Sequence, residues 1–118
     1  MQKGLVNMKA EENMSDIQIL KEDNFDNATS NGVVVVDFYA DWCGPCQMFA
    51  PVFLEASRAY SGRVSFAKVN TDESRELAAR FKVLGIPTIV FFKDGEVAEK
   101  VTQVLGKDEL YAKIDAIL

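Results

Sequence analysis

The chain has 118 residues, of which 48% are hydrophobic and 26% are charged, a composition typical of one globular domain rather than a disordered chain. Its formal net charge of −5 and pI of about 4.7 repel polyanions, so these totals disfavour a protein that binds nucleic acid.

The first part of the chain is polar and shows no periodicity, with methionines at positions 1, 8 and 14. We interpret residues 1–15 as a flexible leader before one domain over residues 16–118, and Met14 could be the natural start. The leader lacks the apolar core of a signal peptide, and no run of about 18 apolar residues is present to cross a bilayer. We therefore expect a cytoplasmic protein that does not bind membranes.

Three elements are predicted before the cysteines. An apolar run at Ile17–Leu20 suits a first strand, and Asp23 offers an N-cap oxygen to a short helix over residues 24–30. Residues 33–39 read VVVVDFY, and this β-branched and aromatic run is typical of a strand covered on both faces. Such a strand is central in a sheet that contains parallel pairs.

A long helix is predicted to begin at or beside Cys43, because apolar residues then recur at helical spacing up to Tyr60. Pro51 lies inside this helix and has no amide hydrogen, so it should bend the helix there. A strand follows at residues 64–69. Thr71 or Asp72 is predicted to cap the next short helix.

The last third of the chain predicts two strands, residues 88–92 and 96–101, joined by a tight turn at Asp94-Gly95. Four apolar residues then form one stripe on a final helix that ends near Ile117. The pattern predicts an α/β fold with a mixed five-stranded sheet and helices on both faces.

The chain contains only two cysteines, in the segment Trp42-Cys43-Gly44-Pro45-Cys46. A strand before them and a helix after them put the two sulfurs one turn apart on one side. Cys43 would face unpaired backbone amides and the positive end of the helix dipole, which favour a thiolate, so it is the predicted nucleophile. Cys46 should lie deeper and be less accessible, as a resolving thiol would.

Two other uses of the cysteine pair are open. A purely stabilising disulfide is a poor explanation, because closing so short a loop contributes only about 1 to 2 kcal/mol in the loop-closure model. A zinc site would need two further ligands, and the chain has no histidine. A redox role is therefore favoured, without help from imidazole.

Asp37 interrupts the apolar strand, so burial should raise its pKa and make it a candidate general base; a solvated sheet edge is the alternative. Lys68, in the strand at residues 64–69, could pair with Asp37 or be an ordinary surface lysine. Ile86-Pro87 comes just before a strand and leaves backbone unpaired, as a peptide-docking loop needs. The residues leave the isomer of this bond undetermined, and trans is the usual one.

Three segments, VVVVDFYADWCGPCQMFAP, AKVNTD and GIPTIVFFKDGEV, resemble the thioredoxin family in order and in approximate spacing, over residues 16–118. The resemblance implies a thioredoxin fold, with about four helices around the sheet and an antiparallel hairpin at the end. It also implies that Cys43 and Cys46 cycle between dithiol and disulfide, with no other cofactor and no metal.

The resemblance assigns further roles by position. Asp37 matches a buried acid that assists deprotonation of the resolving thiol, and Lys68 matches its neighbouring lysine. Pro87 matches a cis-proline that faces the cysteines, and the backbone of Ile86 would pair with substrate. The residues that complete the implied docking surface are Trp42, Gly44 and Pro45.

Two positions depart from the family pattern. Gln47 stands where lysine or arginine is common, which removes one charge near the site. A glycine-containing segment that lines the family's groove falls at Gln103-Val104, where Gln103 adds bulk, although Gly106 leaves a local shift in alignment open. We expect Gln103 to change the range of partners if it faces the groove.

The resemblance implies a monomeric protein-disulfide reductase that receives electrons from thioredoxin reductase. Its implied clients include ribonucleotide reductase, methionine sulfoxide reductase and peroxiredoxin. Two alternatives use the same fold: a disulfide oxidant or isomerase, and a non-enzymatic subunit that lends its groove as a binding surface. Gly-Pro between the cysteines favours reduction.

Overall fold

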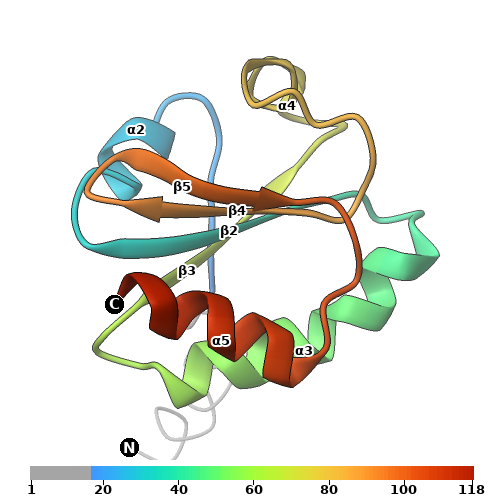
Figure 1. The fold of residues 1–118 in the computed structure, drawn as a ribbon. Helices are drawn as coiled ribbons and strands as arrows, with labels where there is room; N and C mark the ends of the chain where they lie inside the picture. Colours follow the sequence, from blue (N-terminus) through green and yellow to red (C-terminus); the bar gives the residue numbers. More distant parts are fainter. Residues whose placement is uncertain (1–16) are drawn as a thin grey trace, which may run out of the picture.

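The computed structural model describes residues 17–118 (Figure 1), so the predicted leader, residues 1–15, lies outside the described residues. The elements in chain order are β1 (Ile17–Ile19), α2 (Phe25–Ala28), β2 (Val33–Tyr39), α3 (Gly44–Ala59), β3 (Ser65–Asn70), α4 (Arg75–Arg80), β4 (Thr88–Lys93), β5 (Glu96–Val101) and α5 (Lys107–Ile117). This order confirms the predicted alternation of strands and helices and the closing hairpin.

The described strands form one five-stranded sheet in the order β1-β3-β2-β4-β5. β3 pairs in parallel with both β1 and β2, whereas β4 is antiparallel to β2 and to β5. β2 is therefore central, and all of its residues except Tyr39 are buried. The predicted mixed α/β sheet is confirmed.

Alternate residues of β2 face two separate apolar cores. Val33 and Val35 pack with residues of α3 and α5, whereas Val34 and Val36 pack with residues of α2 and α4. Figure 1 shows the same arrangement, with α3 and α5 on one face of the sheet and α2 and α4 on the other. The period-2 alternation of a strand explains why an unbroken apolar run serves both cores.

The predicted cap of the first short helix is wrong. Asn24, not Asp23, is the N-cap of α2, and its side chain makes no cap hydrogen bond. The Asn24 Oδ1 instead accepts a hydrogen bond of 2.7 Å from the backbone N–H of Lys21. The turn before the helix therefore uses this side chain, which moves the helix start one residue further on.

The predicted cap of α4 is also wrong, because Ser74 and neither Thr71 nor Asp72 occupies the N-cap. Asn70 explains the difference. Its Oδ1 accepts hydrogen bonds from the backbone N–H groups of Asp72 and Glu73, at 2.9 and 3.3 Å. These bonds hold residues 71–73 in a turn, so the helix begins later.

The predicted tight turn between β4 and β5 is confirmed. Asp94 and Gly95 have φ angles of 50° and 88°, as the hairpin requires. The turn is tied to the start of β2, because the Gly32 N–H donates to Asp94 Oδ1 at 2.8 Å. The Asp94 N–H in turn donates to the Gly32 carbonyl at 2.9 Å.

Candidate active site

The two cysteines lie where β2 leads into α3, and a disulfide joins them. Cys43 is the N-cap of α3, and its Sγ accepts a hydrogen bond from the Cys46 N–H at 3.1 Å. This geometry confirms that the sulfurs meet at the first turn of the helix. A sulfur that accepts an orphan amide hydrogen at a helix N-terminus is stabilised as a thiolate after reduction.

The predicted difference in accessibility between the two cysteines is wrong for the disulfide form. Cys43 is 3% exposed and Cys46 is 4% exposed. Both pack with Ala40, Tyr39 and Ile86, which cover the sulfurs. Helix position alone therefore does not set exposure, because the loop at Ile86 comes from a distant part of the chain.

The Ile86 carbonyl oxygen lies 3.7 Å from Cys43 Sγ. A disulfide sulfur carries no hydrogen, so this is a contact in the oxidised chain, whereas a Cys43 thiol could donate to that oxygen. The Ile86-Pro87 peptide bond is cis, which the family resemblance implied and the residues alone left undetermined. The structure thus brings Ile86 and Pro87 to the cysteines.

Asp37 is 1% exposed, so the alternative of a solvated sheet edge is wrong. Its Oδ1 has no hydrogen-bond partner among the described residues. Burial raises the pKa of Asp37 to about 7, and the positive charge of Lys68 opposes that rise. A carboxyl group with such a pKa can accept a proton near neutral pH.

Lys68 lies directly opposite Asp37 in the pairing of β2 and β3. It is half-buried, and its Nζ lies 4.3 Å from the centre of the Tyr39 ring. Lys68 is therefore not fully exposed to solvent. Its positive charge lowers the pKa of the buried carboxyl group.

Trp42, Gly44 and Pro45 are exposed on the surface around the disulfide. Trp42 is 72% exposed, and its indole N–H donates to Asp72 Oδ2 at 2.9 Å. This bond fixes a large apolar ring beside the cysteines. No atom would lie within 4 Å of a Cβ at Gly44, so the surface there is open to a partner.

The two departures from the family pattern are also exposed. Gln47 donates from its Nε2 to the Asp41 carbonyl oxygen at 3.0 Å. Gln103 and Val104 follow Thr102, whose hydroxyl hydrogen-bonds with that of Thr88 at 2.9 Å. This contact puts the Gln103 segment beside the strand that follows Pro87.

A pocket of about 200 Å³ lies beside Cys46. Its lining residues are Tyr39, Ala40, Asp41, Cys46, Gln47, Ala50 and Lys68. Sequence reasoning missed Tyr39 and Asp41 here. The signal available was the position of Tyr39, two residues after Asp37 and therefore on the same face of the strand.

Sequence reasoning also missed Leu84. It is 96% exposed and lies two residues before Ile86 in the loop that reaches Cys43. A single exposed apolar side chain is common on protein surfaces, so only its place in the loop that contacts Cys43 singles out Leu84. The signal in the sequence was a leucine directly before Gly85-Ile86-Pro87, in a segment that is otherwise a loop.

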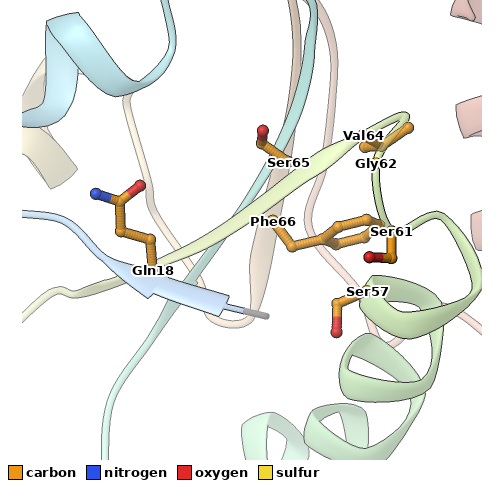
Figure 2. A pocket seen from close by; sticks show the side chains of 7 residues that line it. All are labelled: Gln18, Ser57, Ser61, Gly62, Val64, Ser65 and Phe66. Atoms are coloured by element: carbon orange, nitrogen blue, oxygen red, sulfur yellow. The ribbon is translucent and has the colours of Figure 1, made fainter. Parts of the chain in front are cut away.

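A second pocket lies near the other end of α3 (Figure 2). The lining residues labelled there are Gln18, Ser57, Ser61, Gly62, Val64, Ser65 and Phe66. They include neither cysteine nor any of the predicted site residues. This pocket is therefore separate from the disulfide.

Among residues 17–118, no group of three or more His, Cys, Asp or Glu side chains could hold a metal ion. In the same part of the chain, no helix has the length and apolar character needed to span a membrane.

The comparisons with known proteins agree on one family. The family model described as Thioredoxin matches residues 16–116. A thioredoxin of Staphylococcus haemolyticus is 44% identical over 94 residues, which are 80% of this chain and 90% of that protein. An M-type chloroplastic thioredoxin of Pisum sativum is 37% identical over 110 residues, covering 92% of this chain and 64% of that protein.

A solved structure supports the same relationship. A mutant thioredoxin from Halobacterium salinarum NRC-1 superposes with a TM-score of 0.80 at 38% identity. The match covers 88% of this chain and 93% of that chain.

Proposed function

The chain belongs to the thioredoxin family, and we propose that it acts in the direction of reducing disulfides in client proteins. It is a thiol–disulfide oxidoreductase. The dithiol chemistry rests on the Cys43–Cys46 disulfide at the N-terminus of α3, and Gly44-Pro45 between the cysteines favours the reducing direction. Membership of the family implies disulfide-containing clients and a reductase that regenerates the dithiol.

The reaction starts from the reduced chain. The Cys43 thiolate attacks one sulfur of a client disulfide, which breaks that bond and releases the first client thiolate as a mixed disulfide forms. The Cys46 thiol then loses its proton and attacks Cys43 Sγ, which releases the second client thiolate. Two electrons pass to the client, and the chain is left with the disulfide seen in the structure.

Asp37 is the proposed acceptor of the Cys46 proton. Its pKa of about 7 matches a base that works near neutral pH. Its Oδ1 has no hydrogen-bond partner within the described chain and is therefore free to take a proton, directly or through a water molecule. Lys68 is the proposed charge that keeps enough of Asp37 ionised for this task.

The proposed docking surface surrounds Cys43. The Ile86 carbonyl, 3.7 Å from the sulfur, can accept a hydrogen bond from client backbone. The proposed side-chain contacts are Trp42, Gly44, Pro45, Gln103 and Val104, all of them exposed. This surface would exclude water from the sulfurs while the client is bound.

The proposed setting is the cytoplasm, where thiols are kept reduced and a dithiol reductase can be regenerated. The proposed electron donor is a flavoprotein thioredoxin reductase, which would make the chain part of an electron-transport sequence. Ribonucleotide reductase, methionine sulfoxide reductase and peroxiredoxin are the proposed clients. We propose no cofactor besides the disulfide, and a monomer without nucleic-acid or membrane partners.

The test mixes the chain with insulin and dithiothreitol and follows the turbidity of the reduced B chain. We expect acceleration with the parent chain and none with Cys43→Ser or Cys46→Ser. Acceleration by either variant would contradict the dithiol mechanism. No acceleration by the parent chain would favour a non-enzymatic binding subunit instead.

The direction of electron flow needs a separate measurement, because an oxidant would share the fold. Equilibration with glutathione gives the reduction potential of the Cys43–Cys46 pair. We expect a potential more reducing than glutathione. A more oxidising value would support the alternative of a disulfide oxidant or isomerase.

A further inference from the structure

Three polar or aromatic side chains meet on the α3 face of the sheet. Asp37 and Tyr39 are two residues apart on β2 and therefore share a face. Lys68 is the register partner of Asp37 on β3, so its side chain rises on that face too. Tyr39 and Lys68 also line the pocket beside Cys46.

The Tyr39 ring is the contact that holds the Lys68 ammonium. The Nζ lies 4.3 Å from the ring centre, well inside the range of a cation–π interaction. Within residues 17–118, no carboxylate lies within ion-pair distance of that Nζ. The Lys68 ammonium, whose charge lowers the pKa of Asp37, therefore lies against the Tyr39 ring.

We propose that Tyr39 is a positioning residue, whose ring keeps the Lys68 ammonium beside the pocket at Cys46, on the face of the sheet that carries Asp37, instead of letting it extend into water. This inference rests on the proposed role of Asp37. Without the ring, a lysine side chain at a pocket mouth extends into solvent, where its charge is hydrated and screened. The ring thus decides how strongly the Lys68 charge acts on the buried carboxyl group.

The groups around Asp37 make Lys68 the relevant partner. The residue of β4 opposite Asp37 is Ile89, and Ile89 carries no charge. α3 contributes Cys46 to the pocket that Lys68 lines. Burial raises the pKa of the Tyr39 phenol, and the charge of Asp41 adds to that rise, so the ring stays neutral at working pH.

The first test replaces the ring. Tyr39→Leu should raise the pKa of Asp37 by at least about 0.5 pH unit, because the Lys68 charge moves away. Tyr39→Phe keeps the ring and should leave that pKa unchanged, as should Tyr39→Trp. The measurement is the ¹³C NMR titration of the Asp37 carboxyl carbon in the oxidised chain, with thermal unfolding of each variant as the folding control.

A double-mutant cycle separates positioning from packing. In a Lys68→Met background, Tyr39→Leu should add no further shift, because the charge it positions is gone. The same shift in both backgrounds would mean that the ring acts by packing, and no shift in either would overturn the inference. Should Tyr39→Leu fail to fold, Tyr39→Ile replaces it, since a β-branched residue suits a central strand.

The pH profile of insulin reduction shows whether the change in the Asp37 pKa affects the reaction. In Tyr39→Leu, the acid limb of this profile should move to higher pH by the same amount as the Asp37 pKa measured by NMR. The Asp37→Asn profile tests the proposed base separately, because an unchanged acid limb there would remove Asp37 from the mechanism while the NMR cycle still decides the role of Tyr39.

Discussion

Burial of Asp37 makes its ionised form costly for the folded chain. Its pKa of about 7 in the folded chain lies above the ordinary 3.8, so the folded state binds the proton more tightly than the unfolded state. The contribution of protonated Asp37 to the free energy of unfolding is therefore fully present below about pH 4 and is lost as the pH rises through about 7. The difference amounts to about 4 kcal/mol, since one pKa unit corresponds to about 1.4 kcal/mol.

Asp37→Asn should remove this dependence. We expect the free energy of unfolding of the parent chain to decrease between pH 4 and pH 8, and that of the variant to change much less over the same range. Urea denaturation at each pH measures both. A parent chain that is equally stable at the two pH values would show that Asp37 is ionised without cost, against the burial described above.

Leu84 gives a prediction about client recognition. Because its side chain is 96% exposed, Leu84→Ser should leave the fold unchanged, and because it lies in the loop that contacts Cys43, it should weaken contact with protein clients. We expect the KM for insulin to rise several-fold, because the free energy of one apolar contact with the client is lost. The rate with a small aromatic disulfide should stay the same. Val97→Ser, an exposed position on β5, is the matched control.

At the scale of single residues, the sequence predicted chemistry better than exposure. Asp37 stood out because it follows four valines and interrupts an apolar strand, and its burial is confirmed. The burial of Cys43 was missed because Ile86, which covers it, is 43 residues away along the chain. The cis bond at Pro87 came from the family resemblance, since no local residue type determines that isomer.

The β4–β5 hairpin allows a test at the scale of elements. Gly95 has a φ angle of 88°, which a residue with a Cβ adopts only with strain. Gly95→Ala should therefore lower the free energy of unfolding by roughly 1 to 2 kcal/mol. A Cβ there would meet only ordinary contacts, the nearest at 3.6 Å from the Ser30 carbonyl, so crowding is not the cause.

Gly44→Ala is the matched control for the hairpin, because its Cβ would meet no atom within 4 Å and its φ is not positive. It should leave the free energy of unfolding almost unchanged. Urea denaturation of both variants measures the difference. Equal losses of stability would show that the turn does not depend on its left-handed backbone.

Elements with a strong apolar pattern were predicted well, and their ends were predicted less well. The bounds of β2 match the prediction because six of its seven residues are β-branched or aromatic. The caps of α2 and α4 were wrong because Asn24 and Asn70 place their side chains in local turns. Several polar residues near a helix start can serve as caps, and only these turn bonds decide between them.

At the scale of the whole molecule, the cysteines lie at one end of the sheet, between elements that pack into its two cores. Asp37 lies on β2, and Cys43 lies in the loop that follows β2. Ile86, in the loop before β4, contacts the Cys43 sulfur. The alternation of strands and helices predicted this mixed sheet. It did not predict which side chains line the pocket beside Cys46, because those come from three elements that meet only in the folded chain.

The central claim is that Cys43 is the sulfur that attacks client disulfides. The most direct measurement reduces the chain, adds iodoacetamide at about pH 6, where only a thiol with a lowered pKa is ionised, and follows the alkylation of each cysteine by peptide mass spectrometry. We expect Cys43 to be alkylated first and much faster than Cys46, because its sulfur accepts an amide hydrogen at the N-terminus of α3. Equal and slow alkylation of both sulfurs, or faster reaction at Cys46, would contradict the account.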